Sequence, residues 1–223
     1  MGLASVNLVD YARAMGADVK EFKRNGADMA TIAYDGKTVT YKLNSGIMDD
    51  TKINDRFGFS SFLSDADRKA DVGIAIKDNK LYYDITTPVG NALIRDVGMF
   101  EDRRGDGFIS KNSWFASKVV NKGAWNLKYR EDDGNHWEET LGIPFWGYQT
   151  EMVLDGYFVR VEDVGNITYG YLGTAVGFSQ SWLNTGSSVN HFAGHGVTQW
   201  DNERADQANF AIGINWYNTG KFK

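Results

Sequence analysis

Cysteine is absent from this 223-residue chain, and histidine is scarce. Without cysteine the chain forms no disulfide, no zinc site with thiolate ligands and no cysteine nucleophile. His191 and His195 are spaced so that they would share a metal ion if the segment were helical. Gly194 and Gly196 argue against a firm helix there. We therefore expect neither a metal site nor a cofactor.

Long apolar stretches are also missing. No segment approaches the ~18 consecutive apolar residues of a membrane span, so we expect none. Residues 1–7 lack the basic segment and the apolar segment that open a secretory signal. We expect a mature fragment, an excised domain or a cytosolic protein.

Basic charge is low, with a formal net charge of −5 and with Lys and Arg interleaved among Asp and Glu. Proteins that bind nucleic acid usually present a basic face to the phosphates. This balance disfavours a nuclease without excluding one, because a metal-dependent nuclease can have an acidic site. The chain also has no serine nucleophile motif, phosphate-binding loop or dinucleotide fingerprint.

Aromatic residues, by contrast, are plentiful at 14% of the chain. Flat rings suit the faces of sugars, although aromatic side chains more often belong to a core. We take Trp125 and Trp146 as candidate substrate-binding residues. The remaining composition, with 42% apolar and 24% charged residues, is that of a soluble globular protein.

Local patterns predict an α+β fold. A short helix over residues 6–16 precedes two β-prone runs joined by Asp35 and Gly36, a strong hairpin signal. A second strand pair is expected at 72–76 and 81–85, and a helix from about residue 92. The charged, glycine-rich residues 101–107 form the best domain boundary. We therefore predict a helix-plus-β-hairpin module over 1–100 and a mainly helical α+β catalytic domain over 108–223.

A glycine-rich run occupies residues 163–178. Each glycine weakens an ordinary helix by roughly 1 kcal/mol relative to alanine, so these glycines need another reason. Gly170, Gly173 and Gly177 either form a smooth helix face for packing or allow a ligand to approach closely.

Three polar residues in the same run, Asp163, Asn166 and Tyr169, are spaced three apart. This spacing puts a carboxylate, an amide and a hydroxyl on one side of a turn or helix start. They are the first site candidates, with Asn166 and Tyr169 as substrate-binding residues.

Acidic residues suited to acid/base catalysis lie at the start of this run. We predict a strand over residues 157–161 that delivers Glu162 and Asp163 to its end, where side chains stay accessible. Neighbours on a regular strand face opposite sides, so at most one points into a given cleft. The candidates for the second carboxylate are Asp206, Asp201 and Glu139. The competing interpretation is that such acids are solvated or cap a helix.

Three ordered segments carry a family resemblance over roughly residues 114–217. The first runs from Trp114 to Lys128, the second is the Gly-Asn-x-x-Tyr-Gly run, and the third begins at Asp206 and Gln207. Together they resemble the polymorphic toxin type 44 domain, which is found at the C-terminal ends of large secreted bacterial proteins. The resemblance implies an antibacterial toxin or a wall-directed enzyme. Lys128 and Gln207 join the candidate substrate-binding residues.

The N-terminal helix and hairpin resemble the small N-terminal-type domain first described in copper amine oxidases. The segment offers no histidine, so the resemblance implies no copper. It implies an accessory or wall-associated module.

The favoured hypothesis is a secreted or cell-surface toxin that hydrolyses peptidoglycan, cleaving its glycan as a muramidase does by carboxylate chemistry. We predict Glu162, Asp163 and Asp206 as the catalytic residues. Expected partners are peptidoglycan or another cell-wall glycan and an immunity protein. Two alternatives stay open, a toxin nuclease acting on RNA and a non-catalytic wall-binding module.

Overall fold

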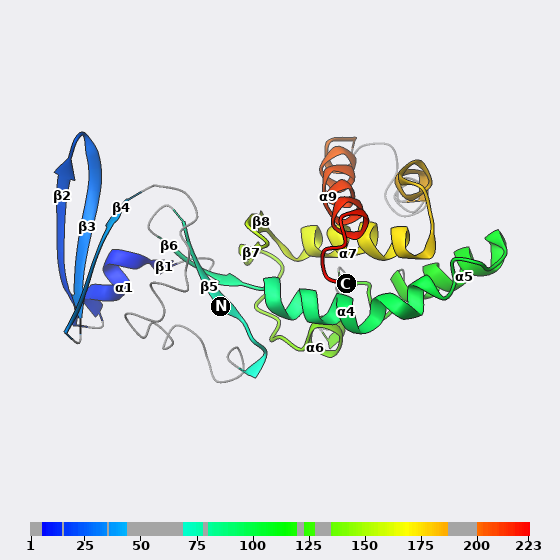
Figure 1. Ribbon diagram of the computed structural model, residues 1–223, viewed down its shortest axis with the longest axis horizontal. Helices are drawn as coiled ribbons and strands as arrows, with labels where there is room; N and C mark the ends of the chain where they lie inside the picture. The colour runs from blue at the N-terminus through cyan, green and yellow to red at the C-terminus, as the bar shows by residue number, and fades with distance from the viewer. Residues whose placement is uncertain are drawn as a thin grey trace. The chain divides into compact units, whose positions relative to one another are not determined.

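A computed structural model describes residues 6–14, 16–34, 36–43, 69–77, 80–119, 123–127, 135–186 and 200–223 (Figure 1). The chain divides into two compact units, the first comprising 1–87 and 149–158 and the second 88–148 and 159–223. Among the described helices, none has the length and apolarity needed to cross a membrane.

The first unit contains a helix and a three-stranded antiparallel sheet. The sheet has the order β2-β3-β4, and its elements are α1 (Leu8–Ala14), β2 (Asp18–Arg24), β3 (Ala27–Tyr34) and β4 (Lys37–Lys42). Apolar side chains of α1 and the sheet are buried, namely Val9, Ala12, Ala30, Ile32 and Tyr41. The hairpin expected around Asp35 and Gly36 is confirmed, because β3 and β4 pair antiparallel with Tyr34 opposite Lys37.

A second sheet in this unit is built around β6 (Lys80–Asp84). β6 pairs antiparallel with β5 (Gly73–Lys77), as expected, and with β1 (Val6–Asn7), and parallel with β7 (Met152–Leu154). A tight turn then leads into β8 (Tyr157–Val159). Asp155 and Gly156 of that turn have φ of 53° and 82°, the left-handed values that a two-residue hairpin turn requires.

The second unit is helical. Its helices are α4 (Thr86–Glu101), α5 (Phe108–Val119), α6 (Asn135–Leu141), α7 (Val161–Val176), a helical segment over 180–186, and α9 (Trp200–Asn218). The first two residues of α4 belong to the first unit, and the second unit begins at Pro88. The α+β expectation is thus confirmed.

The observed boundaries differ from expectation in three places. Residues 88–100, which the sequence assigned to the first module, pack with the second unit, and residues 102–107 form a turn between two helices of that unit. Residues 149–158, which the sequence assigned to the domain over 108–223, belong to the first unit. The strand expected over 157–161 ends at Val159, and α7 begins at Val161. Glu162 and Asp163 therefore lie in the first turn of a helix.

α9 crosses α7, and glycines bring the two backbones together (Figure 1). A Cβ on Gly213 would lie 1.9 Å from the Ile167 carbonyl oxygen, and one on Gly170 would lie 2.3 Å from the Phe210 carbonyl oxygen. These contacts support the packing interpretation of Gly170. They also explain why a glycine-rich segment is helical: the close helix contact offsets the low helix propensity.

Candidate functional site

Asp163 lies three residues beyond Arg160, the residue that precedes α7. Its Oδ2 accepts a hydrogen bond from the Arg160 backbone N–H at 2.8 Å, and its Oδ1 accepts one from Asn209 Nδ2 at 2.6 Å. A carboxylate is favourable at a helix N-terminus because it satisfies a backbone donor and faces the positive end of the helix dipole. The capping role weighed for this residue is therefore present. Glu162, beside it, is exposed.

Asn166 is 2% exposed and faces α9. Its side-chain N–H donates to Asp206 Oδ1. Two Asn–Asp pairs thus join α7 to α9, Asp163 with Asn209 and Asn166 with Asp206. The structure brings three of the predicted residues together at one helix crossing, where Asn166 contacts a carboxylate of the protein itself.

Tyr169 connects the same face of α7 to the helical segment 180–186. Its hydroxyl donates to the Leu183 carbonyl oxygen at 3.3 Å, and its ring packs against Phe115 and Phe210 with centroid separations of 5.4 and 5.0 Å. Burial raises the pKa of its hydroxyl to about 12. The phenol is therefore a neutral structural group at ordinary pH.

A polar hollow of about 570 Å³ lies between segment 180–186 and α9. Among the described residues, the lining side chains carry amides and hydroxyls and are Gln180, Ser181, Asn184, Thr185 and Gln207. Gln207, a predicted substrate-binding residue, directly follows Asp206 in α9. The hollow is a candidate binding site among the described residues.

The sequence reasoning missed the four lining residues of segment 180–186. Their spacing along the chain, at 180, 181, 184 and 185, marks one polar face of a short helix. That signal was present, but it was indistinguishable from an ordinary solvated face.

The other predicted residues lie away from the hollow or outside the described residues. Trp125 is 3% exposed and donates from Nε1 to Asp96 Oδ2 at 3.0 Å, so it is a core residue. Trp146 is half-buried in an irregular segment, and Glu139 is exposed on α6. Residues outside the described ranges are Lys128, His191 and His195; Asp201 lies in α9, but its side chain is not described.

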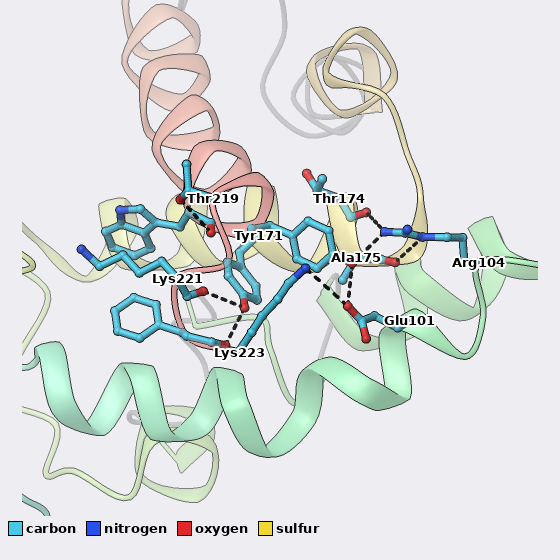
Figure 2. Close-up of polar contacts among 11 residues, drawn as sticks. Glu101, Arg104, Tyr171, Thr174, Ala175, Thr219, Lys221 and Lys223 are labelled. Atoms are coloured by element: carbon cyan, nitrogen blue, oxygen red, sulfur yellow. Dashed lines mark hydrogen bonds and ion pairs between the residues drawn. The ribbon is translucent and has the colours of Figure 1, made fainter.

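A second polar cluster joins α4, α9 and the residues that follow α9 (Figure 2). The Tyr217 hydroxyl donates to Glu101 Oε1 at 2.6 Å and accepts from Arg104 Nη2 at 2.7 Å. Lys223 Nζ lies 3.8 Å from Glu101 Oε1. Burial, followed by the hydrogen bond with Glu101, raises the pKa of Tyr217. Each of these charges has a partner, so the cluster is a structural clamp.

Tyr171 of α7 holds the last described residues in place through hydrogen bonds (Figure 2). It is fully buried, and its hydroxyl donates to the carbonyl oxygens of Lys221 at 3.1 Å and Phe222 at 2.7 Å. The Phe222 ring in turn lies against Gly90 of α4, where a Cβ would be 2.7 Å from the ring. Residues 219–223 are thus part of the fold of the second unit.

Comparison with known families gives a match within the second half of the chain. Residues 114–219 match the family described as Bacterial toxin 44. No curated protein and no solved structure matches the chain. The matched range includes the second half of α5, all of α7 and α9, the described lining of the polar hollow and both Asn–Asp pairs. Residues 114–219 are therefore similar to the bacterial toxin 44 family.

Proposed function

We propose that this toxin domain cleaves the glycan strands of peptidoglycan and that the polar hollow binds the sugar. The observation that carries the proposal is a hollow whose described lining side chains are amides and hydroxyls and include Gln207, the residue that follows Asp206 in α9. Its volume of about 570 Å³ lies within the range of small-molecule sites.

The lining chemistry supports a sugar over a phosphate. Amides and hydroxyls both donate and accept, which matches the hydroxyl and acetamido groups of cell-wall sugars. A nucleic-acid site needs cations for the phosphates, and none of the described side chains that line the hollow is cationic.

Asp206 is the favoured catalytic carboxylate. Asn166 donates to Oδ1, which orients the carboxylate on the helix crossing. In the proposed reaction Asp206 takes a proton from water, the water oxygen bonds to the anomeric carbon, and the glycosidic C–O bond breaks. Glu162, in the first turn of α7, donates the proton to the leaving oxygen. Asp163 keeps its two hydrogen-bonded contacts and holds α7 against α9.

A non-catalytic wall-binding module is the second candidate. One observation favours it: Gly170 packs against the backbone of Phe210, and the buried Asn166 is hydrogen-bonded to Asp206. Much of the Gly-Asn-x-x-Tyr-Gly run therefore has a structural role. Such a module would use the same hollow and would not depend on the Asp206 charge for activity.

Similarity to a toxin family also supports two cellular proposals. The domain would act outside the cell that produces it, as a secreted or surface protein. The producing cell would hold an immunity protein that neutralises it.

The test is digestion of isolated peptidoglycan, RNA and DNA by the purified 223-residue protein, with products identified by mass spectrometry. The variants are Asp206→Asn, Glu162→Gln and Gln207→Ala, and Asp102→Asn serves as a control because Asp102 is exposed in the turn after α4. We expect soluble muropeptides from the wild type and the control, and a loss of about 100-fold or more for Asp206→Asn. Degraded RNA or DNA beside intact wall would replace the glycosidase with a nuclease. Wall binding without cleavage would favour the binding module.

A further inference from the structure

The sheet β2-β3-β4 of the first unit has two different faces. Residues paired between antiparallel strands lie on the same face, and neighbours along one strand lie on opposite faces. Ala30 and Ile32 of β3 are fully buried on one face, whereas the alternate residues Met29 and Thr31 are only half-buried on the other. We call this second side the open face. Its two central rows across the sheet are Phe22–Met29–Lys42 and Lys20–Thr31–Thr40.

Positive charge gathers on the open face. Its cations are Lys20 and Arg24 of β2 and Lys42 of β4, and all three are exposed. Among the described residues of the three strands, the only acid on this face is Asp18, whose carboxylate lies 3.9 Å from Lys20 Nζ. Three cations and one acid give the face a formal charge of +2, in a chain whose net charge is −5.

The opposite face has no such excess. The strands place two cations there, Lys23 and Lys37, together with two acids, Glu21 and Asp28. Lys23 Nζ lies 3.6 Å from Asp28 Oδ1, and Arg13 of α1 donates a hydrogen bond to Glu21 at 2.6 Å. The excess positive charge of the sheet is thus confined to the face that α1 leaves open, where it favours an anionic partner.

We propose that the open face binds an anionic polyol phosphate polymer of the bacterial cell wall. The cations are spread out rather than gathered around one ion. Lys20 and Arg24 are about 13 Å apart along β2, and Lys42 lies two strands away from β2, about 10 Å. A chain with repeated phosphates matches such a spread. The choice of a wall polymer rests on the proposed function, which places the substrate in the wall.

Hydroxyl groups accompany the cations on this face. Thr31 and Thr40 share a hydrogen bond of 2.7 Å, and Thr38 is exposed on the edge strand β4. A hydroxyl both donates and accepts, so these side chains suit the hydroxyls of a polyol and the oxygens of its phosphates. The phosphates would contact the cations, and the polyol units between them would contact the threonines.

A single-stranded nucleic acid is the competing occupant, because its phosphates would bind the same cations. Sites for single strands also stack successive bases on aromatic side chains. Phe22, which is 40% exposed, is the only aromatic side chain that the described residues of the three strands place on the open face. One ring does not form a row for successive bases, so the face suits the polyol polymer better.

The experiment measures binding of fluorescently labelled poly(glycerol phosphate) to the 223-residue protein by anisotropy at low salt. Lys20→Gln and Lys23→Gln form a matched pair, because the two side chains are 76% and 78% exposed on one strand but lie on opposite faces. We expect Lys20→Gln to weaken binding about 3-fold and the double variant Lys20→Gln/Arg24→Gln about 10-fold, whereas Lys23→Gln should change it by less than about 2-fold. Circular dichroism verifies that each variant is folded.

Three results would overturn the proposal. The first is no binding of the polymer by the wild type. The second is an equal loss in Lys20→Gln and Lys23→Gln, because net charge alone would then explain the binding. The third is tighter binding of an oligothymidine with the same number of phosphates, lost in Phe22→Ala, which would assign the open face to nucleic acid.

Digestion of peptidoglycan stripped of its phosphate polymers separates this proposal from the proposed function. The double variant should cleave stripped wall at the wild-type rate, because the open face belongs to the first unit and the lining of the hollow to the second. If the wild type cleaves the wall without binding the polymer, only the proposal for the open face fails. If it binds the polymer and cleaves no wall, the open face stands and the proposed function fails.

Discussion

Gly213 and Gly98 show how differently two helical glycines act. A Cβ on Gly213 would meet the Ile167 carbonyl oxygen at 1.9 Å, whereas a Cβ on Gly98 would meet nothing within 4 Å. The same substitution should therefore have opposite signs at the two positions.

We predict that Gly213→Ala lowers the free energy of unfolding by about 3 kcal/mol or more, because two helix backbones must separate. Gly98→Ala should raise it by about 0.5–1 kcal/mol, because alanine restricts the unfolded chain and suits an exposed helix position. Urea unfolding followed by circular dichroism measures both. A tolerated Gly213→Ala would contradict the α7–α9 contact.

Tyr171 makes the free energy of unfolding depend on pH in the alkaline range. Burial chiefly, with lesser contributions from Tyr217 and Glu101, raises its pKa to about 12 from 10.0. Between these values the unfolded chain has lost the proton that the folded chain keeps, so stability falls as pH rises. We predict a fall of about 1.4 kcal/mol per pH unit from this tyrosine between pH 10 and 12.

The variant Tyr171→Phe should be less stable at pH 7 by about 1 kcal/mol, since it loses its hydrogen bonds to the Lys221 and Phe222 carbonyls. Its stability should depend less steeply on pH above 10 than that of the wild type. Denaturant titrations at pH 7, 10 and 11.5 test this, and parallel slopes would contradict the assignment.

At the scale of elements, the Asn–Asp pairs fix how α7 and α9 meet. A double-mutant cycle with Asn166→Ala and Asp206→Ala should give a coupling free energy of about 1–2 kcal/mol in urea unfolding, because the bond involves a charged group. The control cycle of Asn166→Ala with Gln207→Ala should give less than about 0.5 kcal/mol. Equal coupling in the two cycles would show that the pair is not specific.

Local elements could be predicted from the sequence, and their pairing could not. The β3–β4 and β5–β6 hairpins follow from β-prone runs around short turns, which are local signals. The bond from Asn166 to Asp206 joins residues 40 apart in sequence, and no periodicity encodes it. The hollow has the same origin, because Gln207 meets segment 180–186 only through tertiary packing. The strand predicted over 157–161 ends two residues early, because Asp163 caps the start of α7 there.

At the scale of the whole molecule, the second unit needs α4. Phe100 of α4 is fully buried, and its ring contacts Trp114 and Phe115 with centroids 5.0 and 6.1 Å away. Residues 101–107 resemble a linker in composition, yet Arg104 donates to the carbonyl oxygens of Thr174 and Ala175 at the end of α7. Charged turns between packed helices and true linkers have similar compositions. For this reason the sequence predicted a domain boundary at 101–107, after α4, whereas the second unit begins at Pro88 and includes most of α4.

We predict that a fragment of residues 88–223 unfolds cooperatively and that a fragment of 108–223 does not. Loss of α4 exposes the apolar surface that Phe100 covers. A small helical unit has a low free energy of unfolding, so this loss is enough to prevent cooperative folding. Thermal unfolding followed by near-ultraviolet circular dichroism distinguishes them. A cooperative transition in the shorter fragment, at the temperature seen for the longer one, would contradict the assignment of α4.

The most direct measurement is a nuclear magnetic resonance titration of the ¹⁵N-labelled protein with the N-acetylglucosamine–N-acetylmuramic acid disaccharide. The proposed function predicts chemical-shift changes concentrated on Gln180, Ser181, Asn184, Thr185 and Gln207, the residues that line the hollow. It also predicts that Gln207→Ala weakens binding about 10-fold, the loss expected for one or two hydrogen bonds. Unchanged spectra at millimolar disaccharide, or shifts confined to other surfaces, would contradict a glycan site in this hollow.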